Sequence, residues 1–357
     1  MQRHNKYMKM AINLAKKGRG SVSPNPLVGC VIVKNGNIIG EGYHKTYGGD
    51  HAEINALNNC IESPHDATMY VTLEPCSVHG KTPPCVEKII REGIKEVYIG
   101  CKDLNPKVNG LGIQKLEQFS IKVYSGILFE ECFELSKYFF KWIETGRPWV
   151  IAKVAQTFNG YMGIDSDTSI WITGKETKSH THELRSKVDG ILVGTNTARI
   201  DNPSLTVREV SGNNPIRIII DTNRLLPLDL NIFNDNSAET IILCSKIKFE
   251  DNQTSFCKYL AIKEENNLLD LNSMLDIIGS QGITSIIVEG GQKILRSFYD
   301  DDLIDEMFIY SSKRMVDNAT LENPLKINSD WQILKELDLA DDKLVIARKK
   351  ELCLQES

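Results

Sequence analysis

Two short segments carry the side chains that most constrain how this chain of 357 residues can fold. The first is His51-Ala52-Glu53, and the second contains Cys76 and Cys85. An imidazole and two thiols supply the three protein ligands of a catalytic zinc site, which leaves the fourth position to a water whose pKa falls to about 7. Because the three ligands must meet at one ion, the fold has to bring both segments together. Glu53 then remains as an unligated carboxylate that can move protons.

The spacing of these residues is typical of zinc deaminases, whose motif is H-x-E followed by P-C-x-x-C, with a glutamate that is not a ligand. The first half of the motif is present, but eight residues separate Cys76 from Cys85 instead of two, so the loop between them is enlarged. Taken alone, each residue is more typical of a buried thiol or a hydrogen-bonded histidine, and a structural zinc normally has a fourth protein ligand. Together they predict a catalytic Zn²⁺ bound by His51, Cys76 and Cys85, with Glu53 as the proton carrier.

Local patterns around the motif are consistent with this prediction. Asp50 is a good N-cap for a helix over residues 52–57, which puts His51 and Glu53 in its first turn. Residues 68–73 alternate like a strand. Pro84 predicts a second helix over residues 84–92, whose N-terminal dipole favours a metal-bound thiolate at Cys85.

The length of the chain is comfortable for two domains, and helices alternate with strands in both halves, as in α/β proteins. Turn-forming residues at 144–148 separate the halves, so we predict domains at residues 1–145 and 149–357. The first half is expected to have a helix at its start, strands at 27–33, 38–42, 68–73 and 96–100, and a helix at 127–143. The second is expected to have strands at 149–155, 190–194, 216–220, 240–244, 285–288, 306–310 and 343–347, and helices at 179–187 and 271–279.

Composition excludes several classes of partner. The net charge of −5 provides no basic field for a nucleic-acid backbone. No apolar run is long enough for a membrane span, and the N-terminus lacks the apolar core of a signal peptide. Nine cysteines, an odd number, are scattered through hydrophobic stretches, which favours a reducing cytoplasm. We therefore expect a cytoplasmic enzyme that acts on a small molecule, with neither nucleic acid nor membrane as a partner.

The second half contains a strand that leads through Gly290-Gly291 into a helix. Glycines let the backbone approach a ligand, and a helix start attracts phosphate, although such a pair is also common in a plain tight turn. A polar loop at residues 194–208 follows another strand, and ligands of α/β sheets gather at such strand ends. Arg185 and Arg208 either hold a phosphorylated substrate by bidentate hydrogen bonds or are solvated surface arginines. The Rossmann fingerprint G-x-G-x-x-G is absent.

In order and spacing, these motifs resemble the bifunctional deaminase/reductase family of riboflavin biosynthesis over nearly the whole chain. The residues that carry the resemblance are 23–33, 49–53, the loop 76–85, 202–208 and 288–291. The resemblance implies an N-terminal cytidine-deaminase-like α/β/α domain and a C-terminal dihydrofolate-reductase-like α/β domain. It also implies deamination of 2,5-diamino-6-(5-phosphoribosylamino)pyrimidin-4(3H)-one, NADPH-dependent reduction of the ribosyl group to ribityl phosphate, one Zn²⁺ per chain and a homo-oligomer.

The same resemblance assigns further site residues. In the deaminase, the pyrimidine or phosphate pocket falls on Asn25, His44 and Lys81. In the reductase, the cofactor positions fall on Ala155, Trp171, Thr197, Asp201, Thr222, Gly291, Gln292, Lys293, Ile294, Leu295, Arg296 and Ser297. The substrate positions of the reductase fall on Ser169, Arg185, Leu205, Arg208 and Glu289.

Two positions are left open. Val78 departs from the family, whose members often have a polar residue there, so a substrate contact at this position is in doubt. Lys153 is either a group that polarises the sugar or a surface or structural lysine.

Two other functions share parts of the pattern. A nucleic-acid deaminase, for instance one that acts on transfer RNA, has the zinc motif, but the acidic net charge, the long cysteine loop and the Gly-Gly turn argue against it. A non-catalytic scaffold that binds zinc and a nucleotide is the second alternative. Glu53→Ala separates the scaffold from an enzyme, because only an enzyme loses deamination while it keeps its metal.

Overall fold

The computed structural model describes residues 2–79, 83–106, 108–164, 171–250, 257–316 and 318–350. The chain forms two compact units, Met1–Arg147 and Pro148–Ser357. The division falls inside the turn-forming segment 144–148.

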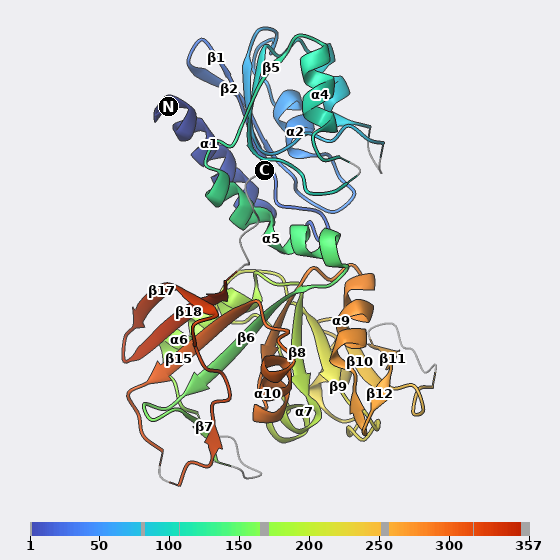
Figure 1. The fold of residues 1–357 in the computed structure, drawn as a ribbon, viewed down its shortest axis with the longest axis vertical. Coiled ribbons are helices and arrows are strands. Elements are labelled where there is room, and N and C mark those ends of the chain that lie inside the picture. The colour runs from blue at the N-terminus through green and yellow to red at the C-terminus, as the bar shows by residue number, and fades with distance from the viewer. Residues whose placement is uncertain are drawn as a thin grey trace. The chain divides into compact units, whose positions relative to one another are not determined.

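Unit 1 is built on a five-stranded sheet in the order β2-β1-β3-β4-β5 (Figure 1). The strands are β1 (Gly29–Lys34), β2 (Asn37–Tyr43), β3 (Thr68–Leu73), β4 (Glu96–Cys101) and β5 (Lys122–Ser125). β1 pairs antiparallel with β2 and β3, whereas β3, β4 and β5 run parallel. Asn35 and Gly36 turn the β1–β2 hairpin with positive φ values of 50° and 84°, as a two-residue loop of this kind requires. The predicted hairpin and strands are confirmed.

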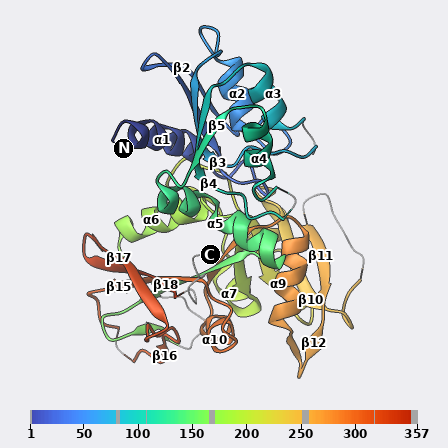
Figure 2. The same ribbon diagram turned by 45° about the horizontal axis from the view of Figure 1, so that its top comes forward.

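Helices cover both faces of this sheet. They are α1 (Gln2–Ala15), the short 3-10 turn η1 (Lys16–Gly18), α2 (Ala52–Asn58), α3 (Cys85–Arg91), α4 (Leu111–Gln118) and α5 (Phe129–Thr145). Val31 and Val33 of β1 are buried with α1 and α5, while Cys30 and Ile32 are buried with α2, α3 and α4. Successive side chains of a strand point to opposite faces, so a continuous apolar strand supplies two cores. Figures 1 and 2 show the resulting α/β/α layers.

Three details of unit 1 differ from the predictions. The N-cap of α2 is His51 and not Asp50. The carbonyl oxygen of Asp50 instead accepts a hydrogen bond of 3.0 Å from the side chain of Asn55. In addition, α4 and β5 were not predicted, because α4 is short and β5 is a largely exposed edge strand without an apolar alternation.

Unit 2 is built on a nine-stranded sheet in the order β11-β10-β9-β8-β14-β6-β15-β18-β17. The strands are β6 (Trp149–Gln156), β8 (Gly190–Gly194), β9 (Ile216–Ile220), β10 (Thr240–Ser245), β11 (Cys257–Ile262), β14 (Ser285–Glu289), β15 (Glu306–Ser312), β17 (Trp331–Leu339) and β18 (Asp342–Lys349). The strands from β11 to β15 run parallel, and β18 and β17 add an antiparallel edge. All seven predicted strands of this half are confirmed, while β11 and β17 were missed.

The helices of unit 2 are α6 (Lys175–Arg185), α7 (Thr195–Asp201), α8 (Asn231–Asn234), α9 (Leu271–Ser280) and α10 (Gln292–Asp300). Two short ladders complete the unit, β7 (Tyr161–Gly163) with β16 (Leu321–Glu322) and β12 (Glu264–Glu265) with β13 (Leu268–Leu269). Met274 of α9 and Phe298 of α10 are buried in one core with Val150 of β6 and Ile286 of β14. Parallel strands connected by helices on the sheet faces thus give the expected α/β fold.

The sequence suggested that the whole segment 194–208 is a loop, but the structure shows that part of it is a helix. Its first part forms α7, which ends at Asn202 in a left-handed conformation with a φ of 37°. The density of Gly, Asn, Asp and Pro around it concealed this two-turn helix.

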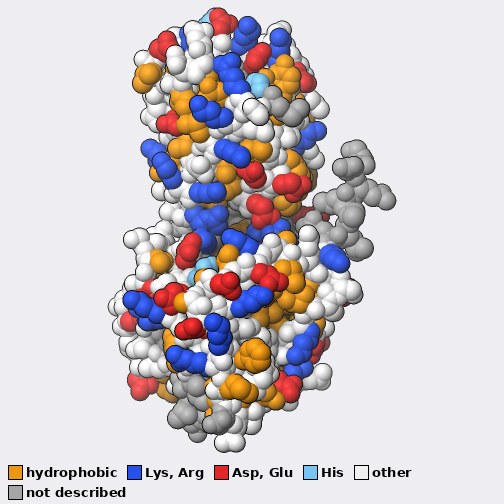
Figure 3. Space-filling view, turned by 90° about the vertical axis from the view of Figure 1, so that its left-hand side faces the viewer, with side chains coloured by type: hydrophobic (Ala, Val, Ile, Leu, Met, Phe, Trp, Pro, Cys, Tyr) orange, Lys and Arg blue, Asp and Glu red, His pale blue; other side chains and the backbone are white. Residues whose placement is uncertain are grey.

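The described residues contain no helix that is both long and apolar enough to cross a membrane. On the face shown in Figure 3, each unit carries basic and acidic side chains together, in keeping with the small net charge.

Candidate active sites

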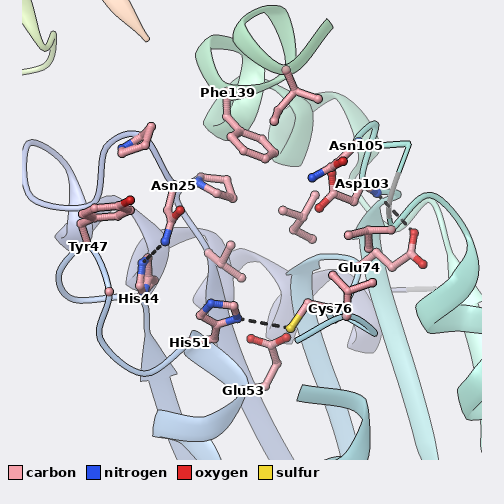
Figure 4. Close-up of a pocket in the computed structure, with 18 of the residues that line it drawn as sticks. Asn25, His44, Tyr47, His51, Glu53, Glu74, Cys76, Asp103, Asn105 and Phe139 are labelled. Atoms are coloured by element: carbon pink, nitrogen blue, oxygen red, sulfur yellow. Dashed lines mark hydrogen bonds between the residues drawn. The ribbon is translucent and has the colours of Figure 1, made fainter. Parts of the chain in front are cut away.

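The side chains of His51, Cys76 and Cys85 meet in unit 1. His51 lies at the N-terminus of α2, Cys76 follows the end of β3, and Cys85 is the first residue of α3. The Nδ1 atom of His51 lies 3.5 Å from the Sγ of Cys76 and 3.3 Å from the Sγ of Cys85 (Figure 4 shows the first two). All three ligand atoms are within 4.8 Å of one another. One nitrogen and two sulfurs at this spacing fit a zinc ion that keeps a fourth position open.

The electrostatics of the cluster favour the ligating form of Cys76, whereas the hydrogen bond to Cys76 and burial raise the pKa of the Cys85 thiol. The hydrogen bonds that Cys76 accepts from Cys85 and His51 lower the pKa of Cys76 to about 4, and the bond to Cys76 raises the pKa of His51 to about 9. The backbone N–H of Cys85 also donates to the Cys76 sulfur at 3.3 Å. A thiolate is the form of cysteine that binds metal. The N-terminus of α3 therefore stabilises an anionic sulfur at Cys76.

Glu53 lies beside the cluster without being one of its donor groups. It sits in the first turn of α2 with only 3% of its surface exposed, and Figure 4 shows its carboxylate next to His51 and Cys76. Burial raises the pKa of this carboxyl above its usual value. A raised pKa suits a group that must accept and then release a proton near neutral pH.

A cavity of about 370 Å³ opens onto this cluster. On one side the Nδ2 amide of Asn25 donates to His44 Nε2 at 3.1 Å, and His44 Nδ1 donates to the carbonyl oxygen of Asp50 at 3.0 Å. Burial lowers the pKa of His44, which favours the neutral ring. Val78 and the apolar side chains of Phe139 and Trp142 also line the cavity. Lys81, which the resemblance assigns to this pocket, lies outside the described residues.

The opposite wall contains residues that the sequence analysis missed, namely Glu74, Asp103 and Asn105. The buried carboxylate of Glu74 accepts four backbone N–H bonds of 3.0 to 3.3 Å, from Asp103, Gly110, Gly112 and Ile113. It therefore holds the segment that places Asp103 and Asn105 at the cavity. Burial raises the pKa of Asp103 to about 6. The available signal was a carboxylate, Glu74, that follows the predicted strand 68–73 directly and lies two residues before Cys76.

In unit 2, the predicted Gly-Gly turn joins β14 to α10. Gly290 and Gly291 have φ values of 88° and 73°, a region that other residues rarely adopt. A Cβ atom on Gly290 would lie 2.9 Å from the Cγ2 of Thr197 in α7. The turn thus brings exposed amides of α10 next to the start of α7. This arrangement can receive a phosphate group at the carboxyl edge of the sheet.

A cluster of charged side chains lies beside this turn. Arg185 of α6 makes a bidentate pair with Glu289 at the end of β14, with N–O distances of 2.8 and 2.9 Å. Lys153 Nζ in β6 lies 3.8 Å from the same carboxylate. Burial alone would raise the pKa of Glu289, but the two cations hold it at about 2, while burial lowers the pKa of Lys153. The fork of Arg185 is therefore engaged by Glu289.

The other predicted residues of unit 2 lie on several elements. Arg208 is exposed, and its backbone N–H donates to His182 Nδ1 at 3.1 Å, while Leu205 is buried with a positive φ of 51°. Trp171 is exposed beside Thr173, Lys175 and Arg314 around a second, shallow pocket. Ala155 lies in β6, Asp201 ends α7, Thr222 follows β9, and residues 292–297 form the first turns of α10. Ser169 lies outside the described residues.

Comparison with known proteins finds one family match in each half of the chain. A family described as "Cytidine and deoxycytidylate deaminase zinc-binding region" matches residues 1–101, and the family "RibD C-terminal domain" matches residues 148–316. The riboflavin biosynthesis protein RibD of Actinobacillus pleuropneumoniae is 39% identical over 323 residues, which cover 89% of this chain and 86% of that protein. RibD of Escherichia coli is 36% identical over 87% of this chain and 88% of that protein.

Solved structures agree along the whole chain. The diaminohydroxyphosphoribosylaminopyrimidine deaminase/5-amino-6-(5-phosphoribosylamino)uracil reductase of Thermotoga maritima has a TM-score of 0.88 and 34% identity, with 98% of this chain and 99% of that chain covered. RibD of Acinetobacter baumannii has a TM-score of 0.87 and 30% identity, with the same coverage. The expected cytidine-deaminase-like and dihydrofolate-reductase-like folds are thereby confirmed. The chain belongs to the RibD family of riboflavin biosynthesis, bifunctional enzymes in which a zinc-dependent deaminase and an NADPH-dependent reductase act on a small phosphorylated pyrimidine.

Proposed function

We propose that unit 1 removes an amine from 2,5-diamino-6-(5-phosphoribosylamino)pyrimidin-4(3H)-one and that unit 2 then reduces the ribosyl group of the product to ribityl phosphate. The observation that carries the first part is the cluster of His51, Cys76 and Cys85 ligand atoms within 4.8 Å, with Glu53 buried beside it at a cavity. His51, Cys76 and Cys85 would hold the zinc ion, which supplies an activated water when bound. Residues 1–147 are the deaminase in this proposal, and residues 148–357 are the reductase.

Glu53 performs the proton transfers of the hydrolysis. Its carboxylate accepts a proton from the water that attacks the amine-bearing carbon, and it returns a proton to the amine that leaves as ammonia. Substrate and water are thereby converted to ketone product and ammonia with no net change at Glu53. The raised pKa of the buried carboxyl supports this role, because it brings proton uptake and release closer to neutral pH.

The cavity residues orient the pyrimidine. Asn25 and the neutral ring of His44 form one hydrogen-bonded wall, and Phe139 supplies apolar surface. We include Lys81 as a phosphate ligand from the family resemblance alone. Val78 offers no polar group, so Asp103 and Asn105 on the opposite wall are better placed to recognise the substrate.

In unit 2 we propose that Gly291 and the first turns of α10 (residues 292–297) receive the cofactor pyrophosphate. Thr197 and Thr222 lie at the adjoining strand ends. Ala155, Trp171 and Asp201 complete the cofactor set. The substrate set is Ser169, Arg185, Leu205, Arg208 and Glu289. Since Arg185 is paired with Glu289, the exposed Arg208 is the better candidate to bind the substrate phosphate.

Lys153 suits a role in the reduction itself. It is buried within 3.8 Å of Glu289, and burial lowers its pKa, which makes it able to donate a proton to the sugar oxygen while hydride arrives from NADPH. The burial of Lys153 and its contact with Glu289 support the interpretation in which it polarises the sugar.

We also propose a cytoplasmic homo-oligomer that binds neither nucleic acid nor membrane. The absence of a basic surplus in a chain with a net charge of −5 supports the first exclusion. The family resemblance supports the oligomer.

A two-stage assay on metal-analysed protein tests the proposal. Ammonia release from the diaminopyrimidine nucleotide should require about one zinc per chain, and NADPH oxidation should require the deaminated product. Activity restricted to transfer RNA would support the nucleic-acid deaminase instead. Protein with full zinc content but no turnover of either substrate would support the scaffold.

A further inference from the structure

The carboxyl ends of β14, β8, β9 and β10 form a continuous edge in unit 2. Gly290 after β14 lies against Thr197 of α7, and Thr195 Oγ1 at the start of α7 donates to the carbonyl oxygen of Ile220 at 2.6 Å. The N–H of Ser245 at the end of β10 donates to the carbonyl oxygen of Thr222 at 3.0 Å. Neighbouring strands are about 4.8 Å apart, so the end of β9 lies about 10 Å along the edge from β14. A dinucleotide held at the Gly-Gly turn can therefore reach past β9.

Arg224 is fixed at this edge by the turn that follows β9. Its backbone N–H donates to the carbonyl oxygen of Asp221 at 3.0 Å, and its φ is 55°, an unusual value for arginine. The buried carboxylate of Asp221 accepts the N–H groups of Leu225 and Leu226 at 3.0 Å each. These hydrogen bonds fix the backbone of the turn after β9 and so fix the position of Arg224 at the end of that strand.

The guanidinium group of Arg224 is pre-organised by its neighbours. It lies 4.3 Å from the centroid of the Tyr259 ring, and Nη1 donates to the carbonyl oxygen of Lys248 at 3.4 Å. Its guanidinium pairs with Glu250 at 3.2 Å, and the side chain of Glu250 is 73% exposed while that of Arg224 is 18% exposed. An ion pair with so exposed a carboxylate is weak, so a phosphate dianion can replace it. A stacked, planar arginine is well suited to bidentate phosphate binding.

The surroundings of Arg224 match the adenosine end of a dinucleotide. Lys246 and Lys248, both exposed, follow β10 and add positive charge, whereas Leu225 and Ile247 are exposed apolar side chains beside them in the chain. In α/β dinucleotide sites, the group at the end of the second strand contacts the adenosine ribose, and an arginine there accommodates a 2′-phosphate. We propose that Arg224 binds the 2′-phosphate of NADPH and thereby selects NADPH over NADH. This inference rests on the proposed location of the cofactor at the Gly-Gly turn.

The test compares Arg224→Met and Arg224→Lys with the wild-type enzyme, with the deaminated nucleotide as substrate and either NADPH or NADH as reductant. Methionine keeps an unbranched chain that can pack on Tyr259 but lacks the charge. We expect Arg224→Met to lower kcat/KM for NADPH by about 10- to 100-fold, the usual effect of a lost hydrogen bond to a charged group, with kcat/KM for NADH unchanged. Arg224→Lys should show a smaller loss, because it keeps the charge without the planar fork.

Lys258→Met is the matched control. It removes one cation from β11 of the same unit, where Lys258 contacts Glu239 and Gln281, and it should change neither reductant's kcat/KM. In addition, 2′-AMP should inhibit the wild-type reductase more strongly than 5′-AMP, and this difference should disappear in Arg224→Met.

The inference is overturned if both Arg224 variants retain the preference for NADPH, or if they lose NADPH and NADH activity to the same extent, which would indicate a structural role. A wild-type enzyme that oxidises neither reductant would instead refute the proposed function of unit 2. The two failures are therefore distinguishable.

Discussion

The two sites of this chain are built in different ways. The candidate site of unit 1 takes its donor atoms from residues 51 to 85 and places them at the starts of two helices and just after the end of one strand. The site proposed for unit 2 draws on residues from Lys153 to Ser297, spread over the ends of several parallel strands and the helices that follow them, and parts of it are exposed. A metal site must be complete in its few donors, whereas a cofactor site can share its binding energy among many contacts. Single substitutions should therefore act more sharply in unit 1 than in unit 2.

Removal of the metal should produce the largest difference between the sites. Treatment with a zinc chelator, or Cys76→Ser, should reduce ammonia release to background, because the activated water is lost. NADPH oxidation with deaminated substrate should be unchanged. Metal analysis and the two separate assays check this. A parallel loss of both activities would show that the sites are not independent.

Glu53→Gln should be the next most severe change. The amide keeps the size of the side chain but cannot carry a proton, so deamination should fall by about 10²- to 10⁴-fold. The zinc content should stay at the wild-type level. Loss of the metal together with the activity would mean that Glu53 serves the site structurally and not as a proton carrier.

Glu289→Gln should affect the stability of unit 2 as well as its activity. The substitution leaves the buried guanidinium of Arg185 and the ammonium of Lys153 without their carboxylate, which should cost about 3 to 5 kcal/mol in the free energy of unfolding. Urea denaturation measures this cost. Glu306→Gln is the matched control, because Glu306 is another buried carboxylate of unit 2 and pairs with Arg348 at 3.2 Å. The control should lose stability but retain the reductase turnover of its folded fraction.

The same carboxylate makes a pH-dependent contribution to stability. The pKa of Glu289 falls from its ordinary value of 4.5 to about 2 in the folded chain. A depressed folded pKa stabilises the fold above the unfolded pKa, and this stabilisation is lost as the pH falls through the folded value. The stability of the wild type should therefore decrease between about pH 4.5 and 2 more steeply than that of Glu289→Gln. Identical acid profiles for the two proteins would contradict the assignment.

Asn25→Ala should have the smallest effect of the five. It removes the hydrogen-bond partner of His44 in the cavity wall, at 3.1 Å, without touching a proposed zinc ligand. The KM for deamination should rise by about 3- to 10-fold, as for a single lost hydrogen bond, with the zinc content unchanged. Asn58→Ala, an exposed position in the same helix as Glu53, serves as the control. A fall in kcat that exceeds the rise in KM would place Asn25 in the chemical step.

Elements with strong local sequence patterns were predicted correctly, and elements with weak patterns were missed. Buried strands such as Gly190–Gly194 and Ile216–Ile220 were predicted at their observed bounds, because a continuous apolar run between turns has few alternatives. The edge strand β5 and the short helices α4 and α7 were missed or taken as loop, since β5 is four residues long and largely exposed and each helix spans only about two turns. The N-cap was misassigned to Asp50, because its carbonyl group and not its carboxylate organises the approach to α2.

By itself, the sequence determined the α/β class, the donor types of the zinc cluster and the glycine turn after β14, because these depend on residue chemistry and short-range periodicity. Tertiary structure alone decided that Glu74 orders the wall containing Asp103, that Glu289 engages Arg185 from 104 positions along the chain, and that Arg224 reaches the edge next to β10. Contacts of this kind depend on strand order. The order β10-β9-β8-β14 is set by how whole helices and strands pack, which no local pattern records.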